Sequence, residues 1–539
     1  MIKYVLSGVA ILFLFPYTVM AINWEEGGVE VTLSSEVYYQ DVRGNEEKSA
    51  LEEGWLYVEN LILDLNQDFA EKVKFQGYSH IRSSNDPQHQ IDRRDVMFVE
   101  GYVRLYDDFY ELWGGDYAES YTPYTLSTSL LGAKAFYKYN DWVKVSALWG
   151  RNRDEDLDHY VRYSAGGRAE FYYKNYVTLG ATFIHTDVDR DSLRPDSPIG
   201  DQFNQVFSGD IHLSLWKDRL HLEAEYACSA YNDDRRDKSL RDQYDSAVLV
   251  KGDINPLKNL TLRAEFERVE PWFNSVLGSA SPDLERAKGE VEYTPWDMLS
   301  MMLFHEYSFD KLNDHSLAEH RTHTHMTSFS STIFPFYKRE DVWNSLTVNL
   351  QIDHTRYYTK DHPRTTDQDD LRANWTISQS LAHWNYSVGY TYGRNWNRAD
   401  RTSEYFSHSP SASLGINYLW LALDWTWTFN WGYEYREYIL SGWIDRVYRG
   451  DGGLSLSYSE TKSILTLNMA IEYYDNSPFS GVADNIRRSY SATFEQVLKE
   501  TEVFSATLTL RSSYTDYDED VPGEDYTEAV YYCSLNLKF

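Results

Sequence analysis

The last nine residues, 531–539, read Tyr-Tyr-Cys-Ser-Leu-Asn-Leu-Lys-Phe, and in this stretch apolar and polar residues alternate. Successive side chains of a β-strand point to opposite faces, so an apolar residue at every second position marks a strand with one apolar face. The stretch therefore predicts a closing strand whose apolar face carries Tyr531, Cys533, Leu535, Leu537 and Phe539.

The same period of two recurs from Val29 to the end of the chain, and no helical period interrupts it. In residues 260–267 the apolar positions are Leu260, Leu262, Ala264 and Phe266, separated by polar or charged residues. Residues 220–226, 425–431 and 465–473 repeat the pattern. The chain is therefore predicted to be all-β, built from many strands of about ten residues that each have one apolar face.

The connections between these strands alternate between short turns and long acidic or polar segments. Short polar turns, most of them with Asn, Asp or Pro, lie at residues 139–141, 173–175, 217–218, 255–259, 294–297, 459–462 and 498–500. The long segments are 41–53, 83–94, 151–158, 187–204, 231–243, 270–284, 308–318, 353–370, 393–408, 434–451, 475–486 and 514–524. This asymmetry is typical of a transmembrane barrel, with short periplasmic turns and long extracellular loops.

One long connection per strand pair gives twelve pairs, and a thirteenth follows if the irregular stretch 114–131 joins two strands. We therefore predict a single antiparallel up-and-down barrel of about 26 strands, within a range of roughly 22 to 26. The barrel would extend over residues 22–539, and we expect neither a plug domain nor a periplasmic domain beside it.

Residues 1–21 have the pattern of a secretory signal peptide. Lys3 precedes an apolar core from Val5 to Phe15, and Val19-Met20-Ala21 supplies a cleavage site before Ile22. We therefore expect export through a cleaved signal peptide.

Composition narrows the class of protein further. The 539 residues include 83 Asp and Glu against 51 Lys and Arg, a formal net charge of -32, and the mean hydropathy is -0.57. The mature chain has no apolar run of about 18 residues, which argues against a helical membrane protein. Aromatic residues make up 16% of the chain, too many for a disordered acidic polymer. The two cysteines, Cys228 and Cys533, fall within predicted strands and are expected to be unpaired.

The closing strand resembles that of Gram-negative outer-membrane β-barrels, which end in Phe behind alternating apolar residues. The resemblance implies that Tyr531, Leu535, Leu537 and Phe539 form a C-terminal signal for the barrel assembly machinery. It also implies a multi-pass barrel in the outer membrane, in contact with outer-membrane lipid and lipopolysaccharide. No nucleic-acid partner is expected.

Two sets of residues are candidate metal ligands. His323 and His325 would share one strand face, and Asp187, Asp189 and Asp191 have the spacing of the start of a calcium loop. Neither set is complete. The two histidines have no evident third ligand on the same strand face, and Ser192 stands where the calcium loop needs Gly. Polar lumen or loop residues are the simpler interpretation of the histidines, and solvated acidic loops that loosely collect divalent ions are the simpler interpretation of the aspartates. The sequence contains no Gly-x-Ser-x-Gly, His-Glu-x-x-His or haem-attachment motif, so we expect neither an enzyme nor a bound cofactor.

A ring of 24 to 26 strands has a diameter on the order of 50 Å, since strands lie about 4.8 Å apart and tilt by about 40°. Inward side chains cannot fill such a ring, so something must narrow it. The uncharged segment 121–132, which overlaps the irregular stretch 114–131, is the internal candidate, either as a plug or as a surface loop. The constriction would be formed by Tyr121, Tyr124, Leu126 and Leu130.

Three functions are compatible with these features. The first is a porin-like channel for cations or neutral solutes, with inward acids Glu223, Glu225, Glu265 and Glu267 opposing Arg263 and Lys72. The second is a scaffold that sheathes a partner protein in its lumen. In size and loop asymmetry the chain resembles the large barrels of porin-cytochrome conduits, which implies a multihaem cytochrome as that partner. The Cys-x-x-Cys of one such family is absent from this sequence. The third is an adhesin or receptor that acts through its long loops.

Overall fold

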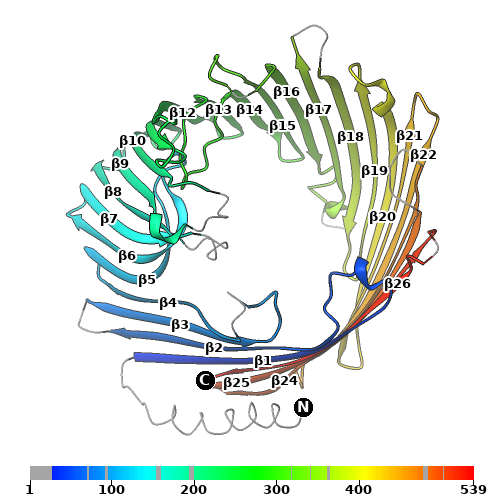
Figure 1. The fold of residues 1–539 in the computed structure, drawn as a ribbon. Coiled ribbons are helices and arrows are strands. Elements are labelled where there is room, and N and C mark those ends of the chain that lie inside the picture. Colours follow the sequence, from blue (N-terminus) through cyan, green and yellow to red (C-terminus); the bar gives the residue numbers. More distant parts are fainter. Residues whose placement is uncertain are drawn as a thin grey trace.

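The computed structural model describes residues 27–539 apart from 69–71, 91–94, 153–159, 194–198, 317, 340–341, 361–364, 478–483, 502 and 522. The described residues form one antiparallel sheet of 26 strands that closes on itself, seen as a ring in Figure 1. This confirms the predicted all-β barrel and its strand number. The predicted signal peptide lies outside the described residues.

The strands follow one another around the ring in chain order. They are β1 Gly27–Gly44, β2 Gly54–Asp68, β3 Lys74–Ser84, β4 Val96–Tyr106, β5 Tyr110–Ser120, β6 Ser127–Tyr139, β7 Val143–Asn152, β8 Arg162–Tyr173, β9 Val177–Val188, β10 Phe203–Leu215, β11 Leu220–Asn232, β12 Gln243–Leu257, β13 Leu260–Val269, β14 Leu284–Trp296, β15 Leu299–Asp310, β16 Thr322–Ile333, β17 Thr347–Thr359, β18 Asp367–Ser380, β19 Trp384–Asn397, β20 Tyr405–Trp420, β21 Leu423–Tyr438, β22 Ile444–Tyr458, β23 Ser463–Asp475, β24 Asn485–Thr501, β25 Phe504–Glu519 and β26 Tyr526–Lys538. Among the described residues, four short 3-10 helices lie in connections: η1 Glu46–Lys48, η2 Arg190–Ser192, η3 Val342–Ser345 and η4 Arg401–Ser403. None of the described helices is long and apolar enough to cross a membrane.

The ring closes where β1 meets β26. The two strands pair antiparallel from Thr32 opposite Lys538 to Gly44 opposite Tyr526. Beyond the strand, the backbone N–H of Phe539 donates to the carbonyl of Val31 at 2.9 Å, and the Val31 N–H donates back at 3.1 Å. The C-terminal stretch is thus paired to its last residue. Its role as an assembly signal stays a prediction.

The two faces of the wall differ as the alternation predicts. On β21, for example, Trp427, Phe429 and Trp431 are exposed on the face that points away from the ring, while Thr428 and Asn430 point inward. Large exposed apolar side chains recur on the outward face around the whole ring. A closed sheet with an apolar outer band pairs its backbone internally and presents hydrocarbon-compatible side chains to lipid, which is what a membrane-spanning β-structure requires.

The long connections are shorter than the sequence pattern indicates, because several strands continue beyond the apolar band. Residues 434–451 were expected to be a loop, yet only 439–443 lie between β21 and β22. The outward side chains of such extensions are polar: Arg446 forms an ion pair with Asp475 at 2.7 Å across neighbouring strands. Alternation of apolar and polar residues is therefore lost while the backbone pairing continues. The irregular stretch 114–131 likewise belongs mainly to β5 and β6, with only 121–126 between them.

The sorting of connections has one exception. Residues 334–346, between β16 and β17, lie on the short-turn side but form a long connection that contains η3. A T-shaped pair of Phe336 and Trp343, with centroids 6.0 Å apart, packs within it. The sequence pattern did not reveal this connection.

Cys533 provides a test of the outward face. Both cysteines are unpaired and exposed, and Cys533 lies opposite Val37 and Leu510 in the apolar band. We predict that, in a Cys228→Ser background reconstituted in lipid, Cys533 reacts with a small membrane-permeant maleimide and resists a charged, impermeant thiol reagent. Mass spectrometry of the labelled protein measures this. Rapid labelling by the charged reagent would place the residue in the aqueous lumen and contradict the face assignment.

Candidate functional site

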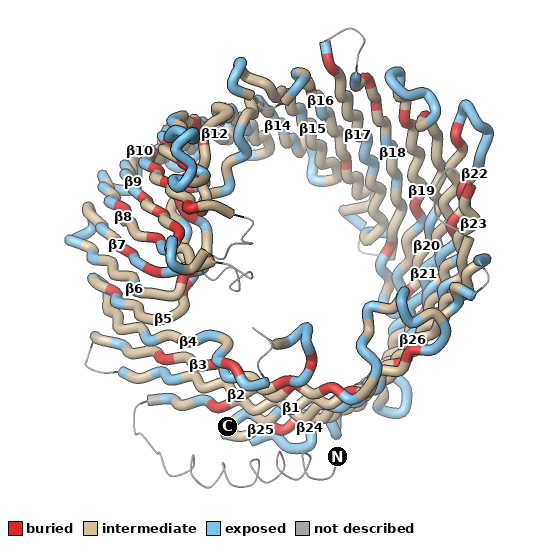
Figure 2. Tube along the Cα trace, in the orientation of Figure 1, coloured by how far each residue is buried: buried red, intermediate tan, exposed pale blue. Residues whose placement is uncertain are grey.

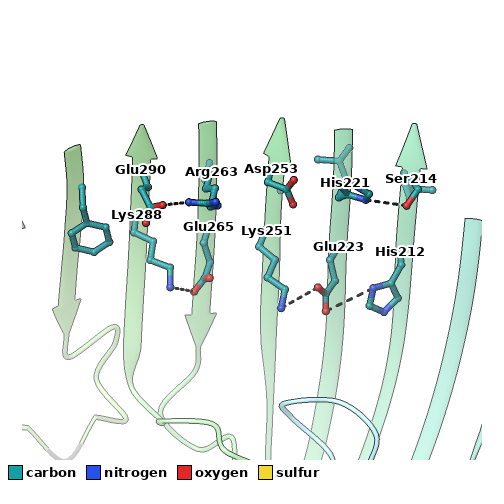
Figure 3. Close-up of a pocket in the computed structure, with 16 residues that line it drawn as sticks. His212, Ser214, His221, Glu223, Lys251, Asp253, Arg263, Glu265, Lys288 and Glu290 are labelled. Carbon is teal, nitrogen blue, oxygen red and sulfur yellow. Dashed lines mark hydrogen bonds and ion pairs between the residues drawn. The ribbon is translucent and has the colours of Figure 1, made fainter. Parts of the chain in front are cut away.

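The inner wall of the barrel carries a row of charges of alternating sign. His212, Glu223, Lys251, Glu265, Lys288 and Glu306 lie directly opposite one another on the adjacent strands β10 to β15. Lys251 Nζ lies 3.0 Å from Glu223 Oε2, and Lys288 Nζ lies 2.9 Å from Glu265 Oε1 (Figure 3). The row from His212 to Lys288 borders a recess of about 450 Å³. Half-exposed pairs of this kind contribute roughly 0 to 1 kcal/mol each, so their main effect is a wettable wall with little unbalanced charge.

The predicted inward acids do face the lumen, but their partners differ from the prediction. Glu223 and Glu265 pair with lysines of neighbouring strands, and Glu267 accepts from Arg286 at 2.6 Å. Arg263 pairs with Glu290 and Glu292. Lys72 lies outside the strands, between β2 and β3, and does not oppose the acids. Register between adjacent strands therefore determines the pairing.

The segment 121–126 lies against the inner wall. Tyr121 accepts a hydrogen bond at 3.0 Å from Ser146 Oγ, whose strand β7 is two strands away along the ring. Tyr124 is 1% exposed and donates its hydroxyl hydrogen to Glu267 of β13 at 3.0 Å. Leu126 and Leu130 are 0% exposed. The four predicted constriction residues thus belong to one packed inner layer. Whether that layer limits permeation stays a prediction.

The connection 270–283, between β13 and β14, reaches across the inner side of the wall to meet this segment. Asn204 of β10 donates to the carbonyl of Asn274 at 2.8 Å, which holds the connection over the inner wall. Its far end makes two backbone hydrogen bonds, from the Ser127 N–H to the Leu277 carbonyl at 2.7 Å and from the Ser279 N–H to the Pro123 carbonyl at 2.8 Å. We name the two segments, 121–126 and 270–283, the inner latch.

The latch covers an apolar part of an otherwise polar wall. Phe273 is 0% exposed and packs edge-on against Tyr124, with centroids 5.8 Å apart. One apolar cluster joins them to inward residues of β10 to β13, namely Val206, Ala227, Ala247, Leu249 and Val269. A second cluster joins Leu277 to Tyr117, Leu126, Leu130, Leu148 and Ile184. Figure 2 shows buried positions on β7 to β10, beside the segments that enter the ring.

A buried ion pair lies near the latch. Arg168 binds Asp210 through two hydrogen bonds of 2.6 and 2.8 Å, and both side chains are almost fully buried. Glu225, 3% exposed, lies beside this pair and beside Thr122 of the latch. Removing one partner of such a buried pair costs about 3–5 kcal/mol, because the other charge loses its compensation.

The Tyr124 phenol stays protonated near neutral pH. Burial raises its pKa most, and the negative charge of Glu267 raises it further, so Tyr124 remains a hydrogen-bond donor.

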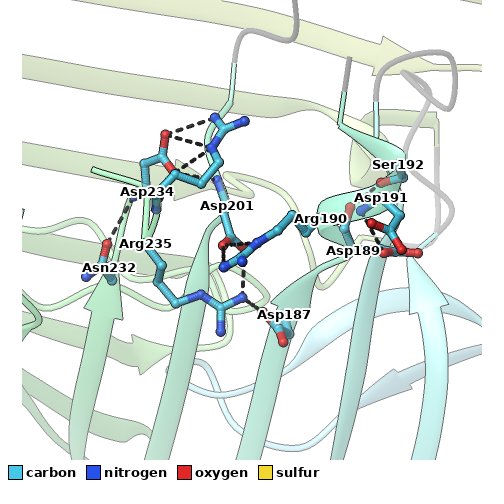
Figure 4. A network of polar contacts seen from close by, with 10 residues as sticks. Asp187, Asp189, Arg190, Asp191, Ser192, Asp201, Asn232, Asp234 and Arg235 are labelled. Atoms are coloured by element: carbon cyan, nitrogen blue, oxygen red, sulfur yellow. Dashed lines mark hydrogen bonds and ion pairs between the residues drawn. The ribbon is translucent and has the colours of Figure 1, made fainter. Parts of the chain in front are cut away.

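A polar clasp joins the connection between β9 and β10 to the connection between β11 and β12 at the rim of the same wall (Figure 4). Asp201 accepts from Arg190 and, at 2.7 Å, from Arg235, which also contacts Asp187. Burial of Asp201 opposes its ionisation, but the two guanidinium groups outweigh burial and hold its pKa below the usual range. The clasp fixes the rim above the latch.

The candidate metal ligands have other partners in the structure. Asp187 belongs to the clasp, and the Asp189 carboxylate accepts from the N–H of Asp191 at the start of η2. His323 and His325 lie on the outward face, stacked with Tyr358. The described residues include no group of three or more His, Cys, Asp or Glu side chains placed to hold a metal.

The sequence pattern groups 270–284 with the other long acidic or polar connections and does not predict its inward course. A signal was present: Phe273, Val276 and Leu277 are apolar residues in a connection that also contains Trp272 and Gly278. Apolar side chains in a loop need a surface to cover them, and here the inner wall provides it.

The fold and its two faces define a membrane-spanning β-barrel of the outer-membrane class. No protein-family model and no curated protein sequence matches the chain. Among solved structures, the outer membrane protein OprD of Pseudomonas aeruginosa is similar at 11% identity and a TM-score of 0.33, covering 68% of this chain and 94% of that one. The siderophore receptor PirA of Pseudomonas aeruginosa is similar at 11% identity and a TM-score of 0.43, covering 95% and 80%. A P pilus tip assembly intermediate of Escherichia coli, PapC-PapD-PapK-PapG, gives 11% identity and a TM-score of 0.45, covering 95% and 61%.

Gly278 tests the packing of the latch. A Cβ at this position would meet the Pro123 carbonyl oxygen at 2.9 Å and Ser275 Oγ at 2.6 Å. We predict that Gly278→Val separates the two latch segments, raising chymotryptic cleavage at Phe273 at least tenfold, a change of about 1.4 kcal/mol in local opening. Gly432→Val on β21, where an added Cβ meets no atom within 4 Å and the backbone φ is not positive, is the control. Unchanged cleavage in a folded Gly278→Val barrel would contradict the packed latch.

Asp201 tests the clasp through pH. Its pKa is lower in the folded protein than in an unfolded chain, where Asp has a pKa of about 3.9, so its contribution is complete above that value and is lost as the pH falls through the folded pKa. Hydrogen exchange around residues 199–202, corrected for intrinsic rates, should therefore stay slow from pH 7 to 5 and accelerate below about pH 4. Asp201→Asn should expose Arg190 and Arg235 to trypsin at pH 7.5, whereas Asp237→Asn should not. Equal cleavage of both variants would argue against the clasp.

Proposed function

We propose that the chain is an outer-membrane channel of the porin type, which passes small cations and neutral polar solutes through a lumen that the inner latch narrows. The observation that carries the proposal is the inward face itself. It combines a wettable, ion-paired wall on β10 to β15 with a packed inner layer on the side of β5 to β13. A non-enzymatic permeation path uses both features, since polar walls support a water column and the inner layer sets its width.

The preference for cations rests on charge at the mouth more than on the wall. Wall acids such as Glu223 and Glu265 are paired with lysines, so they add little net field. The chain as a whole carries a formal charge of -32, and the long connections are acidic. A negative mouth raises the local concentration of cations and lowers that of anions, an effect that salt screens over about 10 Å at 0.1 M.

A sheath for a partner protein is the second candidate. A ring of 26 strands is about 50 Å across, whereas the latch packs along one part of the wall only. On the other side, inward residues of β17 to β20 are polar and border a recess of about 790 Å³, among them Asp353, Arg372, Thr391 and Ser407. A polar partner such as a multihaem cytochrome would be compatible with this surface.

Conductance and reversal potential in planar bilayers test the channel. In a tenfold KCl gradient the purified barrel should conduct steadily and show mild selectivity for K⁺, which weakens as salt rises. Gly278→Val should increase the single-channel conductance, while the wall variant Glu265→Gln should alter conductance only slightly. Selectivity for Cl⁻ would overturn the cation preference. Erratic, very large openings, together with a haem protein that copurifies from the native membrane, would favour the sheath.

A further inference from the structure

The outward face of β15 to β19 is not apolar over its whole height. Above Leu303 on β15 and Ile352 on β17, which face lipid, most of the next outward positions of these five strands carry aromatic, imidazole or charged side chains. Each step of two residues rises about 5 Å in a strand tilted by about 40°, so three such steps extend about 15 Å beyond the last apolar level. We name this surface the outer aromatic patch. It comprises His305, Tyr307, Phe309, His323, His325, Tyr358, Arg356, Asp367, Asp369, Arg394, Trp396 and Arg398.

The rings of the patch form a continuous stack. Tyr358 stacks on His323 at 5.1 Å and on His325 at 6.0 Å, and Tyr307 lies 4.6 Å from His325. The Tyr307 hydroxyl and His323 Nδ1 are 2.8 Å apart in a hydrogen bond. The Nε2 atom of His323, a residue that is 3% exposed, has no hydrogen-bond partner among the described residues. The rings therefore cover much of one another's faces.

Two arginines beside the rings form ion pairs with aspartates of β18. Asp367 and Asp369 are 4% and 8% exposed, whereas the arginines that contact them, Arg356 and Arg398, are 39% and 52% exposed. Arg398 Nη1 lies 2.7 Å from Asp369 and 3.1 Å from Asp367. The buried carboxylates fix the guanidinium groups, and the exposed charge at the surface is positive. A planar guanidinium held in this way is well suited to bind phosphate.

A third arginine, Arg394, lies with its guanidinium 5.3 Å from the centre of the Trp396 ring. The patch therefore has three arginines against two aspartates, in a chain with 83 acids and 51 bases. A local cationic excess on so acidic a chain favours an anionic partner.

The position of the patch restricts what that partner is. Its lower edge continues into the lipid-facing band at Leu303, Ile352 and Trp375. A molecule that covers both surfaces has hydrocarbon below and an anionic head above, at the level of the interface. The tyrosine hydroxyls and histidine nitrogens can form hydrogen bonds with saccharide hydroxyls, and the arginines suit phosphate groups.

We propose that the outer aromatic patch is a binding site for the phosphorylated saccharide headgroup of an outer-leaflet glycolipid, such as lipopolysaccharide. The site goes beyond the proposed channel function and does not depend on whether the lumen conducts. It rests on the placement of the barrel in an outer membrane. The lipid would fix the rim of β15 to β19 in the leaflet.

Lipid retention by purified barrel in nanodiscs tests the site. The full-length protein is incubated with bisphosphorylated lipopolysaccharide in a background of phosphatidylglycerol, and the retained lipid is quantified by native mass spectrometry. Arg356→Gln/Arg398→Gln should reduce retention at least tenfold. Arg394→Gln, which leaves the buried aspartates paired, should reduce it about threefold and serves as the test if the double variant does not fold. Arg488→Gln is the matched control, since Arg488 pairs with Asp516 on β24 and β25, far along the ring.

Several results would overturn the proposal. Retention equal to wild type in both folded patch variants would do so. Equal binding of phosphatidylglycerol or of lipopolysaccharide stripped of its phosphates would show that the phosphorylated saccharide is not recognised. Displacement by inorganic phosphate at similar concentration would reduce the site to a simple anion contact. A change in oligomeric mass, rather than in bound lipid, would identify the patch as a surface between copies of the chain.

Discussion

Hydrocarbon offers no hydrogen bonds, so every backbone N–H and C=O within a membrane must find a partner in the protein. The seam between β1 and β26 meets this requirement for the last two unpaired strand edges. Closure fixes the rest of the structure, because it commits each strand to one lipid-facing and one lumen-facing side. The alternation in residues 531–539 follows from this requirement, because the closing strand needs an apolar face toward lipid and backbone pairing up to Phe539.

Closure at 26 strands leaves a wide lumen, and the side chains of the inner wall must therefore find their partners along the wall. The ring is too wide for inward side chains to meet across it, so each charge finds its partner on the adjacent strand, as Lys251 does with Glu223. Apolar inward residues are permitted where something covers them. Val206, Ala247 and Leu249 lie beneath Tyr124 and Phe273 of the inner latch, and the latch in turn depends on these residues for its position. The inner layer is thus part of the wall's folding as well as of its proposed permeation path.

The sequence predicted the features that depend on local periodicity: the all-β class, the strand number and the lumen-facing side of Glu223, Glu225, Glu265 and Glu267. It could not predict features that depend on register or on distant contacts. The partner of Arg263 is Glu290 rather than one of these acids, because pairing follows the alignment of neighbouring strands. Residues 434–451 were misassigned as a loop, since their outward side chains lie beyond the apolar band and lose the alternation. The inward course of 270–283 depends on residues near 123 and 204, which no local pattern connects.

The seam can be measured directly, because Cys533 already lies opposite Val37 in the pairing of β26 with β1. In a Cys228→Ser background, Val37→Cys should form a disulfide with Cys533 under mild oxidation. The bond would join the two ends of the chain and change its migration on a denaturing gel, and Tyr39→Cys or Ser35→Cys, one step away on the same face, should give far less product. Absence of the Val37→Cys bond in folded protein, or equal product from all three variants, would contradict the closed barrel on which this account rests.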